Sequence, residues 1–139
     1  MSILLVLHAS IAGFMIFFML IVPPSAFKAL STDSVSKFLR VLFPRMFIFG
    51  LILSTIATIV GAATSKDLRT TLSGIVALGF VLNLVILTPR INKYRDMDLE
   101  GDKVAKRTFA YLHTASVIIF VLQTVISVLI IIDHFVSLI

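Results

Sequence analysis

One histidine and two methionines share a face of the first apolar segment of this chain. Met15 and Met19 follow His8 by seven and eleven residues, which places each of them within about 20° of His8 around a helix of 3.6 residues per turn. Imidazole and thioether groups are ligands for soft copper, so this spacing indicates a site for Cu(I). The preferred interpretation is structural, because methionine commonly fills gaps in apolar packing and a histidine near a helix end often bonds a neighbour.

Two further histidines lie in the last apolar segment. His134 is at its far end, and antiparallel packing of the first and last segments would bring it near His8. The pair His8 and His134 is therefore the candidate site for a cofactor such as haem. His113 lies near the opposite end of the segment, roughly 20 Å away in depth at 1.5 Å per residue, which disfavours a haem held by His8 and His113.

Two amides occupy the middle of apolar segments, where a polar group needs a partner. Asn83 and Gln123 are expected to pair with each other between helices, aided by Ser116, Thr124 or Ser127, and His113 joins this interhelical polar set. Such bonds contribute about 0.6 kcal/mol on average in membranes. A path for a polar substrate is the functional alternative.

Several classes of chemistry are excluded by the composition and motifs. The chain has no cysteine, so disulfides, thiolate metal sites and cysteine nucleophiles are ruled out. It has no HExxH, GxSxG, GxGxxG or Walker motif, and such motifs mark the common metalloprotease, hydrolase and nucleotide sites. We therefore expect a protein without a catalytic site, and no nucleic-acid partner.

The elements that position these residues are long apolar helices. Hydrophobic residues make up 59% of the 139 residues and the mean hydropathy is +1.12, far above a soluble domain. Four stretches without Asp, Glu, Lys or Arg are long enough to cross about 30 Å of hydrocarbon, approximately residues 3–22, 46–64, 70–88 and 108–132. The sequence predicts an all-α fold, a four-helix transmembrane bundle forming one domain over residues 1–139.

The basic residues indicate the orientation of the bundle. The long connections 23–45 and 89–107 hold ten Lys and Arg residues against two on the opposite side, so the connections should face the cytoplasm and both termini outward. We expect a prokaryotic cytoplasmic membrane, or an organelle inner membrane derived from one. The cations expected to contact lipids or a partner are Lys37, Arg40, Arg45, Arg90, Lys93 and Arg95. The acidic run from Asp96 to Asp102 argues against a simple polybasic lipid clamp.

Both connections contain local structural signals. Residues 31–43 place Val35, Phe38, Leu39 and Leu42 at helical spacing before Pro44, which predicts a separate short amphipathic helix at the membrane interface. Glu100 and Gly101 indicate a turn, and Asp102 is positioned to cap the last and longest helix. Glycines inside the spans predict close approaches between helices, at Gly13, Gly50, Gly61, Gly74 and Gly79.

Several of these elements together resemble a known family. The elements are His8, Val22-Pro23 with Phe27, Leu42-Phe43-Pro44-Arg45, Leu87-Thr88-Pro89-Arg90-Ile91-Asn92, and Phe109 with Leu112-His113 and Ser116. They are similar to the membrane family labelled domain of unknown function 4149, which is related to eukaryotic transmembrane protein 205. The resemblance implies a four-helix membrane protein. A looser likeness in layout links the chain to the CopD and HemJ groups, which implies copper handling or haem-dependent chemistry, although the third segment lacks the lysine expected for HemJ.

These observations favour a small non-enzymatic membrane protein, an accessory or structural subunit that contacts lipids and packs against a larger complex or a second copy of itself. The alternative is a copper- or haem-binding membrane protein that uses the outer-side residues His8, Met15, Met19 and His134.

Overall fold

The structure consists of four long helical rods. The computed structural model describes residues 3–64 and 67–136. The helices are α1 (Ile3–Ala29), α2 (Thr32–Thr64), α3 (Leu68–Val81), the π-helix η1 (Leu82–Leu87), α4 (Thr88–Leu99) and α5 (Lys103–Val136). Because α3, η1 and α4 follow one another without a break, they form a single rod, Leu68–Leu99. The prediction of an all-α, four-helix fold is confirmed.

Each rod is long and apolar enough to cross a membrane. The shortest, α1, has 27 residues and is about 40 Å long at 1.5 Å per residue, which exceeds a hydrocarbon layer of about 30 Å. The predicted charge-free spans 3–22, 46–64, 70–88 and 108–132 each lie inside one rod. The chain is a multi-pass membrane protein.

The predicted separate interfacial helix at residues 31–43 is wrong. These residues are helical, but α2 continues without interruption through Pro44 to Thr64. Proline removes one backbone donor and does not by itself end a helix when the remaining bonds and the packing hold it. Part of the predicted apolar face of this segment is turned into the protein, since Val35 is buried, whereas Phe38 is 42% exposed. In the same way α1 runs through Pro23 and Pro24, where the sequence indicated an end.

The connections at the basic end are therefore short. Only Leu30 and Ser31 separate α1 from α2, and only residues 100–102 separate α4 from α5. Gly101 has a positive φ of 99°, a conformation that glycine adopts without strain. The Asp102 carboxylate accepts hydrogen bonds from the backbone N–H groups of Val104 and Ala105 at 2.8 and 3.0 Å. Asp102 thus caps α5, which is the longest helix with 34 residues.

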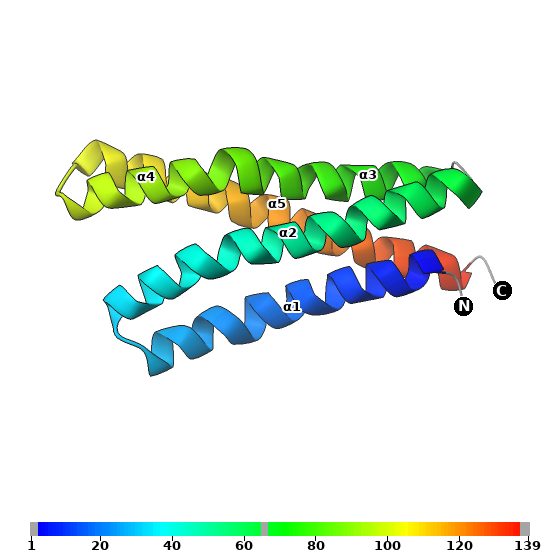
Figure 1. Cartoon of the computed structure of the whole chain (residues 1–139), viewed down its shortest axis with the longest axis horizontal. Helices are drawn as coiled ribbons and strands as arrows, with labels where there is room; N and C mark the ends of the chain where they lie inside the picture. The colour runs from blue at the N-terminus through cyan, green and yellow to red at the C-terminus, as the bar shows by residue number, and fades with distance from the viewer. Residues whose placement is uncertain (1–2, 65–66, 137–139) are drawn as a thin grey trace.

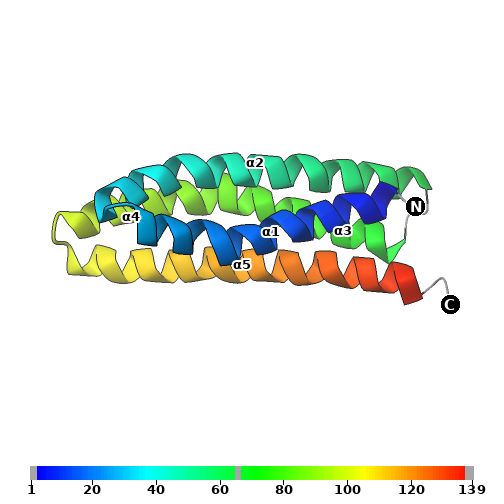
Figure 2. The same ribbon diagram turned by 90° about the horizontal axis from the view of Figure 1, so that it is seen from below.

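The bundle is closed at one end and splayed at the other. Both termini lie at the closed end together with the turn between α2 and α3, and the two short connections lie at the opposite end (Figures 1 and 2). Neighbours around the bundle are α1 and α2, α2 and α3, α3 and α5, and α5 and α1. Towards the connections, α1 and α2 diverge from α4 and α5 (Figure 1).

The core extends from the closed part to the start of the splayed end and is rich in aromatic rings. Its buried members come from all four rods, and they include Ile11, Met15, Phe18, Met46, Phe47, Val76, Phe80 and Phe120. Glycine permits the tightest contact, because a Cβ on Gly50 would lie 2.3 Å from the ring of Phe80. The expectation of a close approach does not hold at Gly13, where nothing lies within 4 Å of the added atom.

Candidate functional site

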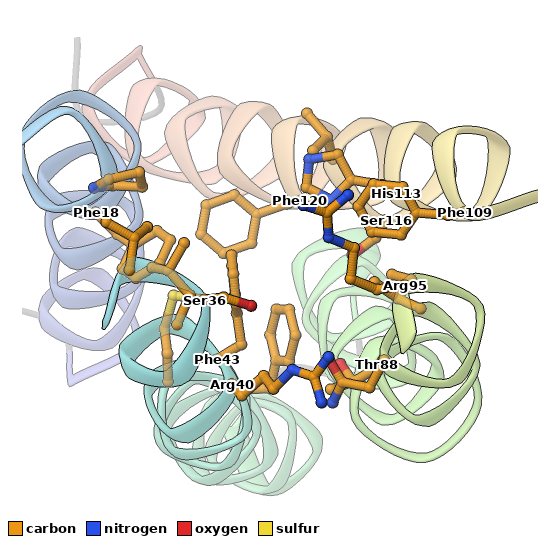
Figure 3. A pocket seen from close by; sticks show the side chains of 18 of the residues that line it. Phe18, Ser36, Arg40, Phe43, Thr88, Arg95, Phe109, His113, Ser116 and Phe120 are labelled. Atoms are coloured by element: carbon orange, nitrogen blue, oxygen red, sulfur yellow. The ribbon is translucent and has the colours of Figure 1, made fainter. Parts of the chain in front are cut away.

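A cavity of about 620 Å³ occupies the splayed end of the bundle. This volume lies within the range of roughly 300–1,000 Å³ typical of small-molecule sites. Side chains from α1, α2, α4 and α5 converge around it (Figure 3). It is the product of tertiary packing, because it exists only where two pairs of helices part.

The inner wall of the cavity is aromatic. The rings of Phe18 and Phe43 lie 5.3 Å apart between centroids, and those of Phe18 and Phe120 lie 6.1 Å apart. Phe47 completes the cluster, with centroids 6.0 Å from Phe43 and 6.3 Å from Phe120. Tilted and offset aromatic pairs at such distances contribute about 0.5–1.5 kcal/mol each beyond their area burial. The wall is therefore both apolar and held in a defined shape.

Two guanidinium groups line the outer part of the cavity, and each is paired with a carboxylate of α4. Arg40 from α2 forms a two-pronged bond with Asp96, in which Nη1 donates to Oδ2 at 3.2 Å and Nη2 donates to Oδ1. Arg95 donates to Asp98 at 2.7 Å. The Arg40–Asp96 pair links α2 to α4 across the splayed end. It therefore bridges the two arms of the bundle, which are the pair α1 and α2 and the pair α4 and α5.

One phenylalanine holds the second guanidinium in place. The Arg95 guanidinium carbon lies 5.3 Å from the ring centroid of Phe109, a distance at which a cation is attracted to the ring face. The imidazole of His113 stacks on the same residue at 5.8 Å with an interplanar angle of 13°. Arg95, Phe109 and His113 all line the cavity (Figure 3).

The cations predicted to contact lipids or a partner divide into two groups. Arg40 and Arg95 line the cavity. The others lie exposed outside its lining, with Lys37 paired to Asp33 at 2.8 Å along the same helix; the remaining members are Arg45, Arg90 and Lys93. Sequence reasoning identified the basic end but not this division, which depends on how α2 and α4 face each other.

His8 lies in the closed end, and its two hydrogen bonds are with serines. The ring is fully buried, with Nε2 2.8 Å from the Ser73 hydroxyl and Nδ1 3.3 Å from the Ser127 hydroxyl. Because Ser73 donates its proton to the Arg69 carbonyl at 2.7 Å, Nε2 donates to Ser73 and Nδ1 accepts from Ser127. Both ring nitrogens are thus used, and neither bond is with His134.

The other predicted ligands are spread along the molecule. Met15 is buried, and its sulfur accepts a hydrogen bond from Thr124 at 3.6 Å, whereas Met19 lines the cavity. The ring of His134 lies 6.0 Å from that of Phe135. Within residues 3–64 and 67–136, no group of three His, Asp or Glu side chains is close enough to hold a metal ion. A copper ion or haem at His8 would have to displace a serine bond.

The mid-membrane amides bond between helices, but not to each other as predicted. The Ser116 hydroxyl donates to Asn83 Oδ1 at 2.6 Å, and Gln123 Nε2 donates to the Val76 carbonyl at 2.7 Å. Asn83 Nδ2 and Gln123 Oε1 are buried without a protein partner. Since a buried unpaired polar atom costs roughly 1–3 kcal/mol, these two atoms are places for a bound water.

The π-helix η1 contains Asn83. It spans Leu82–Leu87, and the backbone N–H of Thr88 bonds to the carbonyl of Asn83, five residues earlier. Sequence reasoning did not predict it. The available signal was Pro89, which has no N–H to offer the preceding turn, together with a polar residue in the middle of the span. Short π-helical turns of this kind are frequent at functional sites.

The comparisons with known proteins agree with the resemblance. A family model described as domain of unknown function (DUF4149) matches residues 6–99, which is more than half of the 139 residues. The match runs from α1 to the end of α4 and contains the elements Phe43-Pro44-Arg45 and Pro89-Arg90-Ile91-Asn92. No curated protein and no solved structure matches the chain.

Proposed function

Because the chain belongs to the family of domain of unknown function 4149, whose label assigns no activity, we propose its function from the geometry of the cavity. The protein is a small non-enzymatic membrane protein that binds an amphipathic molecule of the membrane at the splayed end of its bundle. The single observation that carries this proposal is the cavity of about 620 Å³ with an aromatic inner wall and two guanidinium groups at its outer part.

The order of the lining residues along the helices fits such a ligand. On α2, Phe47 and Met46 lie at the start of the charge-free stretch, Phe43 is one turn before it, and Arg40 is nearly one turn further out. The apolar part of a ligand would therefore lie against the rings at the depth of the hydrocarbon. Its polar part would meet the arginines at the level of the headgroups.

Binding is proposed in preference to catalysis because the ionisable groups of the cavity are committed to partners. Arg40 and Arg95 are ion-paired, and His113 stacks on Phe109. A general acid or base needs to be within hydrogen-bond reach of a reacting group, whereas the two guanidinium groups here face carboxylates of the protein itself.

The test uses the fact that the chain contains no tryptophan. Phe43→Trp and, as a second reporter, Phe109→Trp each place one fluorophore in the cavity wall. Phe17→Trp is the matched control, since Phe17 is 58% exposed on the outer face of α1. The protein in detergent is titrated with phosphatidylethanolamine, phosphatidylglycerol or phosphatidylcholine brominated in the acyl chains, because bromine quenches tryptophan on contact.

The proposal predicts saturable quenching of both cavity reporters at a low mole fraction of at least one lipid. The Phe17→Trp control should follow the mole fraction without saturation. If all three reporters follow the same linear dependence with every lipid, the cavity does not retain an amphipathic ligand and the proposal is wrong.

An accessory role in a larger complex is the second candidate, and two highly exposed side chains on one side of α5 favour it. Val104 and Tyr111 are 73% and 76% exposed and are seven residues apart, so they lie on one side of the helix. Large exposed aromatic residues are enriched where proteins meet. Purification in mild detergent should then recover a stoichiometric membrane-protein partner that Tyr111→Ala fails to recover.

Copper or haem binding is the remaining alternative, and it would use His8 with Met15, Met19 or His134. It requires His8 to give up a bond to Ser73 or Ser127. Metal analysis and the visible spectrum of the purified protein decide this alternative: stoichiometric copper or a Soret band supports it, and the absence of both removes it.

The distribution of Lys and Arg indicates the orientation of the bundle in the membrane. We propose that the splayed end with its two basic connections faces the cytoplasm and that both termini face outward, because Lys and Arg are concentrated in those connections. A prokaryotic cytoplasmic membrane or an organelle inner membrane derived from one is the proposed location.

A further inference from the structure

We propose that the ligand of the cavity is a phospholipid with a zwitterionic headgroup that carries a primary ammonium, as in phosphatidylethanolamine. This inference rests on the proposed binding function and names the ligand class. The phosphate would be bound by Arg40 and Arg95, and the ammonium by Asp96.

The first argument is the pairing of charges at the mouth of the cavity, defined here as the two ion pairs Arg40–Asp96 and Arg95–Asp98. A phosphate that replaces the Asp96 carboxylate on Arg40 leaves that carboxylate without its partner. A headgroup with net negative charge brings no cation to replace the guanidinium, and the displaced carboxylate then lies beside a like charge. A zwitterion brings one charge of each sign, so every charge keeps a partner after binding.

The second argument is geometry. The Arg40 guanidinium already binds a carboxylate through two parallel N–H donors, and the same planar fork fits two phosphate oxygens. When the phosphate takes this position, Asp96 loses its partner and the lipid ammonium replaces it. The exchange is sterically accessible because the side chains of Arg40 and Asp96 are 34% and 54% exposed.

The third argument distinguishes an ammonium from a quaternary choline. Choline has no N–H to donate to a carboxylate, and proteins recognise it instead on open aromatic faces. The aromatic ring that contacts the Arg95 guanidinium is that of Phe109, which also stacks with His113. The mouth therefore offers acceptors for hydrogen bonds rather than a cage for choline.

A consequence follows for the arms of the bundle. The Arg40–Asp96 pair is a direct ionic link between α2 and α4 at the mouth. A bound headgroup inserted into this pair would replace the link by a bridge through the lipid, so the two arms stay connected while the lipid is present.

The experiment compares headgroups with the Phe43→Trp and Phe109→Trp reporters. Brominated phosphatidylethanolamine, phosphatidylglycerol and phosphatidylcholine, with identical chains, are titrated in the same detergent. We expect phosphatidylethanolamine to bind about tenfold more tightly than either of the others, which corresponds to one charge-assisted hydrogen bond.

Two variants test whether residues of the mouth cause the preference for one lipid headgroup. Asp96→Asn removes the proposed ammonium acceptor at constant size, and the ratio between phosphatidylethanolamine and phosphatidylglycerol should fall to about one. Arg40→Gln should weaken all three lipids by about tenfold, because each carries the phosphate. Asp33→Asn is the control, since Asp33 pairs with Lys37 on the exposed side of α2, and it should change nothing.

The outcomes separate this inference from the function on which it rests. Saturable binding in which phosphatidylglycerol or phosphatidylcholine equals or exceeds phosphatidylethanolamine overturns the headgroup assignment and leaves the binding function standing. An unchanged preference in Asp96→Asn overturns it as well. Linear quenching with all three lipids overturns both.

Discussion

The contact between Gly50 and Phe80 sets the distance between α2 and α3, and adding one methyl group tests it. In Gly50→Ala, the new Cβ would lie 2.3, 2.5 and 2.7 Å from three ring atoms of Phe80. The ring has little room to move, because Phe80 is fully buried and packs against Phe14 and Phe47 with centroids 6.3 and 6.4 Å away.

The magnitude follows from the comparison with a second glycine. Replacing glycine by alanine in a helix is favourable by up to about 1 kcal/mol, and overpacking a full core is unfavourable by about 1–3 kcal/mol. Gly13→Ala has only the first effect, since nothing lies within 4 Å of its added Cβ. The helix propensity cancels when the free energies of unfolding of the two variants are compared. Gly50→Ala should be less stable than Gly13→Ala by about 1–3 kcal/mol.

The assay is reversible unfolding in mixed micelles, with the denaturing detergent titrated and helix packing followed by circular dichroism and by protection from proteolysis. A second variant, Gly50→Ala with Phe80→Leu, removes the ring atoms that the methyl group meets. Its loss of unfolding free energy should be smaller than the sum of the losses in the two single variants by about 1 kcal/mol or more. Equal stability of Gly50→Ala and Gly13→Ala would refute the close approach of α2 and α3.

Three other predictions concern the closed end, the orientation and the π-helix. His8→Leu removes a hydrogen-bond partner from two buried serines and should lower the free energy of unfolding by about 1–3 kcal/mol in the same titration. With single cysteines in this cysteine-free chain, a membrane-impermeant thiol reagent applied to intact cells should label Thr64→Cys and not Ser31→Cys; the opposite pattern contradicts the proposed orientation. Deletion of Val85 from η1 should leave folding and lipid binding nearly unchanged, because it converts the π turn to α without rotating the helix beyond it, whereas deletion of Ile75 from α3 should disrupt both in the quenching assay.

The four rods were predictable because their signal is local and strong. Long charge-free apolar stretches satisfy their backbone only as helices in lipid, and the cap at Asp102 depends on neighbours two and three residues away. The helix ends were less predictable. Proline often ends a helix, yet Pro23, Pro24 and Pro44 each lie inside one, because the lost backbone bonds are few and packing keeps the helices intact.

The site was less predictable, since it depends on which helices meet. The partners of His8 are 65 and 119 residues away in sequence, and the spacing within one helix gives no information about them. The cavity likewise depends on the angle between two helix pairs. What the composition did indicate was a basic end whose charge is partly offset by acidic residues, and Arg40 and Arg95 form ion pairs with two of them.

The π turn explains how one rod can serve both the core and the cavity. Up to the start of the π turn, Val76, Phe80 and Asn83 are buried at spacings of four and three residues. Beyond the π turn, Thr88 and Arg95 line the cavity and are seven residues apart. Each set of residues therefore forms a stripe along one face of the helix. The step from Asn83 to Thr88 is five residues, and it coincides with the hydrogen bond from the Thr88 N–H to the Asn83 carbonyl, which stacks the second stripe directly above the first. In an uninterrupted α-helix each residue turns by about 100°, so the same sequence would direct Arg95 about 100° away from this line and separate Asp96 from Arg40. The π turn in η1 therefore absorbs one residue and keeps Thr88 and Arg95 in line with Asn83, as the proposed lipid site requires.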